Sequence, residues 1–192
     1  MIGSYALKLR LEVTEEQAFI LDGQSRLCNK AYNDLLEIAL NLRKQYIETL
    51  DTESCTTLYP KRGLRNLLPS LKKKSPFLNL VHSSPLKNAA LRLECSIKAY
   101  QDSKKGRRKG SPTGFPKFRS WRKNQWFSLL YDEPKKGFRI TGNLLTLSLG
   151  KGEDGKRRSL AITLTESSKL KEKEIRNLRI THENGIYYAV FT

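Results

Sequence analysis

The stretch YALKLRLEVTEEQ (residues 5–17) decides how this chain folds. Every second residue from Tyr5 to Leu11 is a large apolar one, which is the period-two pattern of a half-buried strand ending near Val13. Thr14 and Gln17 have the spacing of a capping box, which predicts the start of a helix. A lone strand is not stable by itself, so its partners must come from later in the chain.

Helical patterns occupy the next part of the sequence. Apolar residues recur at helical spacing from Leu27 to Tyr46, which predicts one long helix, or two separated near Gly23. A loop containing residues 51–60 follows, and then a short helical piece around 64–68 that Pro69 is expected to end. Lys72 to Lys74 form an expected basic turn.

The last predicted helix begins at Ser84-Pro85, with Ser84 as its N-cap, and runs to about Ser103. Beyond residue 125 the apolar period changes to two. Strands are predicted at 126–131, 138–140, 144–149, 160–164, 175–180 and 186–191, with a strong hairpin signal at Glu183-Asn184-Gly185. The simplest architecture is an α+β fold, in which a small β-barrel carries a bundle of about four helices inserted after its first strand.

Positive charge is concentrated in the second two-thirds of the chain. The net charge is +17, made up of −3 over residues 1–60 and +20 over residues 61–192, and the sequence pI is about 9.9. The segment KKGRRKGSPTGFPKFRSWRK (residues 104–123) contains nine Lys or Arg and no carboxylate, interleaved with aromatic residues. Such a segment favours a nucleic acid partner, and the sequence has no apolar run long enough for a membrane span.

The three cysteines indicate neither disulfides nor a zinc site. Cys28, Cys55 and Cys95 are widely spaced and form no C-x-x-C pair. Cys28 and Cys95 fall in apolar helical patterns, where a thiol usually fills core space. We therefore expect a reducing, cytoplasmic setting.

Four features together resemble the N-terminal half of the transposon-encoded OrfB/TnpB proteins, which are RNA-guided nucleases related to the compact type V CRISPR effectors. In order along the chain, they are KLRLEVTEEQ, RLCNKAYNDLL with Asn29, SPLKNAALRLECSIKAY, and GFPKFRS followed by hairpins ending in NGIYYAVF. The four features cover nearly all of residues 4–191, and GFPKFRS is the most specific of them.

The resemblance implies a wedge domain of the oligonucleotide-binding barrel type at residues 1–13 and 115–192, with a helical recognition domain at 14–110 and a basic linker at 104–123. Such domains bind a guide RNA scaffold and a short motif in duplex DNA beside the target. In this family, cleavage belongs to a RuvC-type half that follows these domains, where three carboxylates hold Mg²⁺ and a zinc ribbon is often present. We expect no cofactor in this chain and a prokaryotic, nucleoid-associated location.

The basic linker supplies the expected RNA contacts, because a Gly-rich basic segment can follow phosphates without reading sequence. The candidates are Lys104, Lys105, Arg107, Arg108, Lys109, Lys117, Arg119, Trp121, Arg122 and Lys123. In GFPKFRS, we expect Phe115 and Phe118 to anchor the linker in the core while Lys117 and Arg119 point the other way toward phosphate. Trp121 fits a core position and a stacking position equally well.

The resemblance places DNA-motif contacts on Tyr59, Ser83, Ser84 and Lys87. Simple packing of Tyr59 and capping by Ser84 are the structural alternatives. Asn29 matches a family position, and a hydrogen bond between two helices would explain it equally well.

Three functions remain open. The first is an RNA-guided DNA-recognition module with guide RNA and target duplex DNA as partners. The second is the front half of a nuclease whose catalytic half is truncated or carried by a separate chain, which would then be a further partner. The third is a free-standing helix-turn-helix DNA-binding protein, against which the linker aromatics argue.

Overall fold

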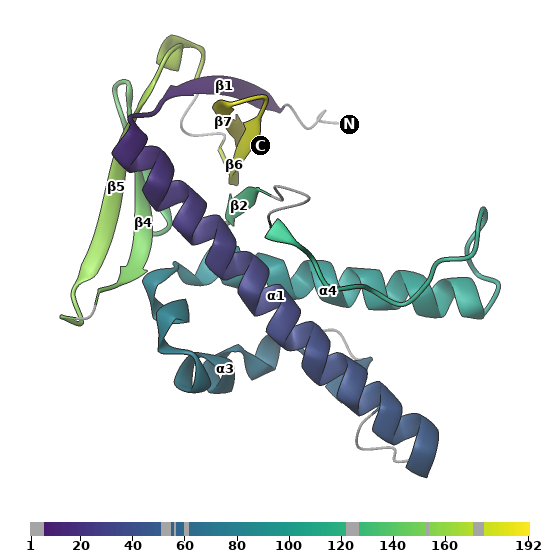
Figure 1. Ribbon diagram of the computed structural model, residues 1–192. Coiled ribbons are helices and arrows are strands. Elements are labelled where there is room, and N and C mark those ends of the chain that lie inside the picture. Colours follow the sequence, from purple (N-terminus) through teal and green to yellow (C-terminus); the bar gives the residue numbers. More distant parts are fainter. Residues whose placement is uncertain are drawn as a thin grey trace. The chain divides into compact units, whose positions relative to one another are not determined.

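The computed structural model describes residues 6–50, 55, 57–59, 62–121, 127–152, 154–170 and 175–192. This part of the chain is a mixture of helices and antiparallel strands (Figure 1). Among the described residues, no helix combines the length and apolar character that crossing a membrane requires.

Seven strands form one antiparallel sheet in the order β2-β6-β7-β1-β5-β4-β3. Their bounds are β1 Leu7–Glu12, β2 Ser128–Tyr131, β3 Phe138–Thr141, β4 Leu144–Lys151, β5 Arg157–Leu164, β6 Leu178–Glu183 and β7 Ile186–Phe191. Strands β2 and β3 are the two edges, so the sheet is open over the described residues, and the expected closed barrel is not confirmed.

Strand β1 joins the two halves of this sheet. Its residues Leu7–Arg10 pair with β7, and Leu11 and Glu12 pair with β5. Leu9 and Leu11 are buried while the alternate side chains are exposed, as the period-two pattern predicts. The prediction that the N-terminal strand takes its partners from the later β region is therefore confirmed.

The final hairpin has the predicted turn. Strands β6 and β7 pair up to Glu183 and Ile186, which leaves Asn184 and Gly185 as a two-residue loop. Both have positive φ, 50° and 78°, as a type I′ turn requires, and Asn and Gly are the residues that adopt it most readily.

Helix α1 is a single helix from Glu15 to Thr49, so the chain is not interrupted at Gly23. Its capping box is present. The backbone N–H of Gln17 donates to Thr14 Oγ1 at 3.2 Å, and the Thr14 N–H donates to Gln17 Oε1 at 2.8 Å. Gln17 Nε2 also donates to the backbone oxygen of Ala161 in β5 at 2.8 Å, which fixes the start of the helix against the sheet.

The region after α1 corrects the prediction for Pro69. A 3₁₀ turn at Arg65–Leu67 leads into α3 (Leu68–Lys74), and Pro69 lies in the first turn of that helix instead of ending one. A proline suits the first turn because the N–H it lacks would have no helical partner there. The expected basic turn of Lys72 to Lys74 is the last turn of α3.

A second 3₁₀ turn, Pro76–Leu80, precedes α4 (Ser83–Lys104), and a third lies at Ser167–Lys169. The predicted capping by Ser84 is wrong. Its hydroxyl is buried and makes no hydrogen bond with any described residue, whereas its backbone N–H donates to His82 Nδ1 at 3.2 Å.

The chain forms two compact units. The first comprises Met1–Cys28, Phe77–Pro85 and Trp126–Thr192, and the second comprises Asn29–Pro76 and Leu86–Gln125. The core of the first unit contains the buried leucines and isoleucines of the sheet together with Leu21 and Cys28 of α1. Burial raises the pKa of Cys28 from 9.0 to about 12, so its thiol stays neutral.

The core of the second unit lies between the later part of α1 and most of α4. Its buried residues include Ala31, Tyr32, Leu35, Leu36 and Ala39 of α1 and Leu86, Ala89, Ala90, Leu93 and Ile97 of α4. Cys95, expected in this core, is exposed, so that prediction is wrong. It is separated from Leu93 and Ile97 by two positions, which on a helix turns its side chain to the opposite face.

Candidate nucleic-acid interface

Helix α4 ends in a structure that places positive charge at its C-terminus. The Arg107 N–H donates to the Asp102 oxygen at 2.8 Å and the Gly106 N–H to the Ser103 oxygen at 3.2 Å, with Gly106 at φ 66°. This is a Schellman motif, in which glycine adopts the left-handed conformation without steric cost. The partial negative charge of the helix end favours the cations that follow.

We name residues 104–110 the basic loop. Each of its residues is exposed, including Lys104, Lys105, Arg107, Arg108 and Lys109. The nearest carboxylate in sequence, Asp102, is bound by Lys98 Nζ at 2.6 Å. That hydrogen bond, helped by the charges of Lys98, Arg107 and Lys105, lowers the pKa of Asp102. The side chains of the basic loop therefore form an exposed cluster of positive charge.

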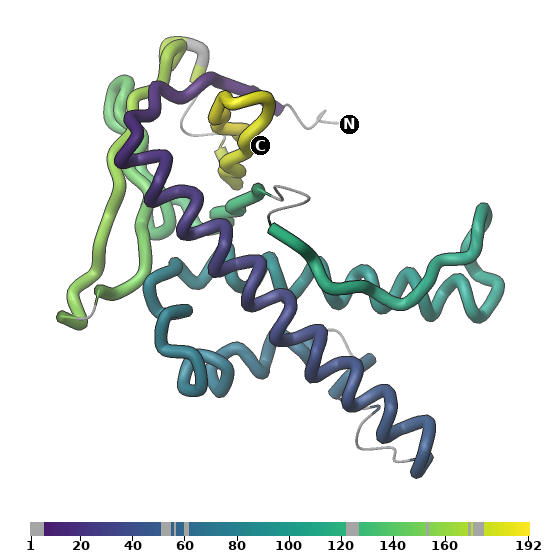
Figure 2. Tube along the Cα trace, in the orientation of Figure 1, coloured from purple at the N-terminus to yellow at the C-terminus, as the bar shows by residue number. Residues whose placement is uncertain are grey.

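We name residues 113–121 the strip. Beyond the basic loop, the trace turns back and runs alongside α4 (Figure 2). The Thr113 N–H donates to Ser103 Oγ at 2.9 Å. Further on, the Phe115 and Tyr100 rings form a T-shaped pair with centroids 5.3 Å apart, and the Arg43 guanidinium carbon lies 4.8 Å from the Phe115 centroid. Phe115 is half-buried in this cluster and thus fastens the strip to α1 through Arg43 and to α4 through Tyr100.

Two asparagines of α1 hold the strip at Arg119. The Asn33 carboxamide makes two bonds, because its Oδ1 accepts from the Arg119 N–H at 2.9 Å and its Nδ2 donates to the Arg119 oxygen at 2.9 Å. Asn29 Nδ2 donates to the same oxygen at 3.2 Å. Asn29 thus binds the backbone of the strip, and the alternative of a hydrogen bond between two helices is not what the structure contains. We call this arrangement the asparagine clamp.

The clamp turns the Arg119 side chain inward. Its guanidinium carbon lies 3.6 Å from the centroid of the Tyr32 ring, and burial lowers the pKa of Arg119 while Tyr32 opposes this effect. The prediction that Lys117 and Arg119 point together to solvent is therefore wrong for Arg119. Lys117 is exposed, and Phe118, expected in the core, is 57% exposed. The strip is not paired in the sheet, so its side chains need not alternate.

Trp121 is half-buried, and Arg122 and Lys123 lie outside the described residues. The structure thus brings together part of the predicted RNA set. Six of the predicted cations are exposed on the basic loop and the strip, at positions 104, 105, 107, 108, 109 and 117. Arg119 instead packs its guanidinium on the Tyr32 ring of α1.

The four residues predicted to read DNA do not form one cluster. Ser84 is buried, which keeps its hydroxyl from solvent. Tyr59 is half-buried and its pKa is raised by burial, with smaller effects from Cys55 and Tyr100. Because Tyr100 is one of the groups that act on the pKa of Tyr59, Tyr59 lies near the Tyr100 end of α4. Lys87 is about 20 Å from Tyr100 along α4, given the rise of 1.5 Å per helical residue, so Lys87 is distant from Tyr59. Ser83 and Lys87 are both near the start of α4, about one helical turn apart.

Lys87 has a second cation beside it. Burial lowers the pKa of Lys72, at the end of α3, and the charge of Lys87 lowers it further. Lys73 and Lys74 follow Lys72 and are exposed. Positive charge is therefore gathered at the start of α4 as well as at its end.

Sequence reasoning missed Asn33, Arg43, Tyr100 and Ser103. One signal was available for the first of these, because Asn29 and Asn33 are one helical turn apart and asparagine is disfavoured inside helices unless its side chain has a partner. The partner itself is 86 residues away, so its identity could not be inferred from local pattern.

A cavity of about 550 Å³ lies in the first unit where β1 meets α1. Its lining includes Arg10, Glu12 and Glu15, together with Thr163 and Tyr187. The mixture of charges gives this cavity no preference for a polyanion. In the described part of the chain, no three His, Cys, Asp or Glu side chains are grouped so that they could hold a metal ion.

No protein-family model and no curated protein matches this sequence.

Proposed function

We propose that this chain is an RNA-guided DNA-recognition module that binds a guide RNA scaffold and duplex DNA beside the target. The observation that carries the proposal is the basic loop, in which five exposed cations lead into a strip fixed to its scaffold at three places. Cations held in this way bind phosphates by releasing condensed counterions, without reading sequence.

The preference for RNA is supported by the strip. An exposed cation, Lys117, and an exposed aromatic ring, Phe118, occupy neighbouring positions beyond the basic loop. Aromatic rings stack on unpaired bases, which structured RNA offers in loops and bulges and which a regular DNA duplex does not. The chain is therefore proposed to bind structured RNA more tightly than random duplex DNA.

We also propose which domain types the sheet and the helices are. We take the open sheet to be the wedge domain of the oligonucleotide-binding type, and the helices inserted after β1 to be the recognition domain. The order of one strand, then helices, then six strands supports this, together with the four sequence features that resemble OrfB/TnpB proteins. The proposed contacts to duplex DNA are the neighbouring cations Lys72 and Lys87, together with Ser83. The proposed setting is the nucleoid of a prokaryotic cell.

The proposed role includes no cleavage by this chain, and a chain bearing the nuclease half is a proposed further partner. Filter binding at one salt concentration tests the binding preference, with a structured RNA and a random DNA duplex as the probes. The expected result is tighter binding of the RNA. Equal affinity for the structured RNA and the random DNA duplex would contradict the proposed preference for RNA.

Sequencing of RNA that co-purifies with the chain tests the guide RNA directly. A single enriched RNA species is the expected result. RNA fragments distributed in proportion to cellular abundance would contradict the proposed guide and leave only general polyanion binding.

A further inference from the structure

Phe118 is exposed although the chain around it is fixed. Phe118 as a whole residue is 57% exposed, while the next residue, Arg119, has its backbone N–H and oxygen bound by the asparagine clamp and its guanidinium against Tyr32. The exposure therefore does not come from a loose loop. It is a consequence of where the clamp sets the backbone.

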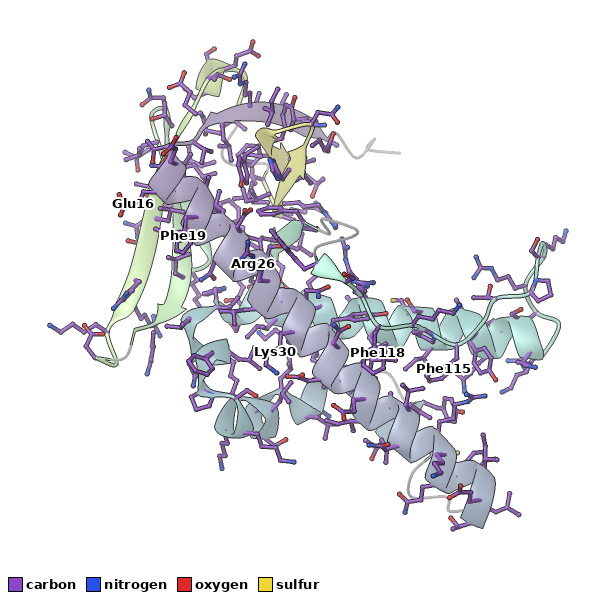
Figure 3. All side chains as sticks on the ribbon, viewed as in Figure 1. Glu16, Phe19, Arg26, Lys30, Phe115 and Phe118 are labelled. Carbon is purple, nitrogen blue, oxygen red and sulfur yellow. The ribbon has the colours of Figure 1, made fainter. Side chains whose placement is uncertain are left out.

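The two phenylalanines of the strip have different surroundings (Figure 3). Phe115 packs against Tyr100 and Arg43 and contributes to the second unit. Phe118, three positions further along, is an exposed residue, and an exposed aromatic side chain contributes little to folding. A single exposed apolar side chain is common on protein surfaces, so exposure alone does not mark a site. What distinguishes Phe118 is the fixed backbone beside it and the positive charge of the same segment.

The chemistry beside the ring indicates the kind of ligand. Lys117 is exposed and adjacent in sequence, and the five cations of the basic loop belong to the same continuous segment. An aromatic face for a base and an ammonium group for its phosphate are the two elements that bind single-stranded nucleic acid. A purely apolar partner surface would leave this charge without a counterpart.

We infer that Phe118 is a stacking platform for an unpaired nucleotide base, with Lys117 contacting the adjoining phosphate. This inference rests on the proposed RNA binding and names the kind of RNA feature that the strip takes. The backbone beside the ring is already held at Arg119 by the asparagine clamp, so little backbone entropy is lost when a base stacks on the ring.

The test uses the full chain and a short single-stranded RNA that carries 2-aminopurine, whose fluorescence is quenched when it stacks. A fully paired duplex of the same sequence is the second probe. Phe118→Ala is expected to weaken binding of the single strand about 5- to 150-fold, which is the usual contribution of one stacked base. The quenching should be lost, and binding of the duplex should change little.

Three further variants separate stacking from other roles. Phe118→Leu keeps an apolar side chain without a ring and should bind as weakly as Phe118→Ala, whereas Phe118→Trp should restore both affinity and quenching. Phe19→Ala is the matched control, because Phe19 is 78% exposed on α1 and its sequence neighbours are the uncharged Ala18 and Ile20. This control should bind like the original chain.

The outcomes distinguish this inference from the proposed function. Single-strand binding that is unchanged in Phe118→Ala, or preserved in Phe118→Leu, would overturn the stacking role. In that case a protein partner would become the better explanation of the exposed ring, while a fall in salt dependence on neutralising the basic loop would still support RNA binding. If the original chain binds neither probe, both the proposed function and this inference are wrong.

Discussion

The asparagine clamp makes a quantitative prediction for Asn33→Ala. The substitution removes two hydrogen bonds to the peptide of Arg119, each 2.9 Å long. The Arg119 oxygen keeps its bond from Asn29 at 3.2 Å, whereas the Arg119 N–H loses the Asn33 acceptor. A neutral hydrogen bond contributes about 0.5–1.5 kcal/mol, and an unpaired buried group costs about 1–3 kcal/mol. We therefore expect a loss of about 2 kcal/mol in the free energy of unfolding.

The control for this variant is Asn41→Ala. Asn41 is exposed on the same helix, so replacing it with alanine changes helix propensity without removing a hydrogen bond to the strip. Urea unfolding followed by circular dichroism measures both variants. The difference between them isolates the clamp, and about 2 kcal/mol corresponds to a melting temperature lower by about 4–8 °C for a chain of this size.

Asn29→Ala should cost less, because Asn33 still donates to the Arg119 oxygen. Replacing both asparagines should cost more than the sum of the two single changes, because the oxygen then loses both donors together. Hydrogen exchange at the Arg119 amide gives a local measurement, and its protection should fall in Asn33→Ala but not in Asn41→Ala. The clamp would be refuted if Asn33→Ala were as stable as Asn41→Ala with unchanged protection of that amide.

Phe115→Ala should lower the free energy of unfolding by about 1–2 kcal/mol, less than the 3–5 kcal/mol typical of a fully buried phenylalanine, because Phe115 is half-buried. A chemical denaturation curve checks this. A loss above about 2 kcal/mol would mean that Phe115 is a full core residue. Iodoacetamide at neutral pH should label the exposed Cys95 and leave Cys28 unmodified in the folded chain, and peptide mass spectrometry showing equal labelling would contradict the buried position. The raised pKa of Cys28 means that its neutral thiol stabilises the fold fully below pH 9.0 and that this contribution is lost as the pH rises toward about 12. The original chain should therefore lose more stability over that interval than Cys28→Ala, and equal losses in alkaline unfolding experiments would contradict the assignment.

Features encoded locally could be predicted from the sequence. The capping box of Thr14 and Gln17 depends on residues three apart, and the turn at Asn184-Gly185 depends on two neighbours with a preference for positive φ. The alternation in β1 predicted which of its side chains are buried. In each case, the residues that determine the structure lie within a few positions of one another.

Features set by distant contacts could not be predicted in the same way. The orientation of Arg119 is decided by asparagines on α1, and an extended segment outside the sheet has no pairing to enforce alternation. Pro69 is compatible with the end of one helix and with the first turn of the next, and the choice depends on how α3 packs through Leu68 and Leu71. Cys95 is a different case, because its position two residues from both Leu93 and Ile97 already turns it away from the buried face, so the sequence contained the information that the prediction overlooked.

The central claim is that the cations of the basic loop bind the phosphates of RNA, and the salt dependence of RNA affinity tests it most directly. The variant changes Lys104, Lys105, Arg107, Arg108 and Lys109 to glutamine. Each phosphate contact contributes about 0.7–0.9 to the slope of log affinity against log salt, so five contacts predict a slope smaller by about 3.5–4.5.

The matched control removes five exposed cations of the sheet region instead, namely Lys135, Lys136, Arg139, Lys151 and Lys156. Both variants lose the same charge, and folding should change little in either because the altered side chains are exposed. The account predicts a large fall in slope for the basic-loop variant and a smaller one for the control. An unchanged slope in the basic-loop variant, or an equal fall in both, would contradict it.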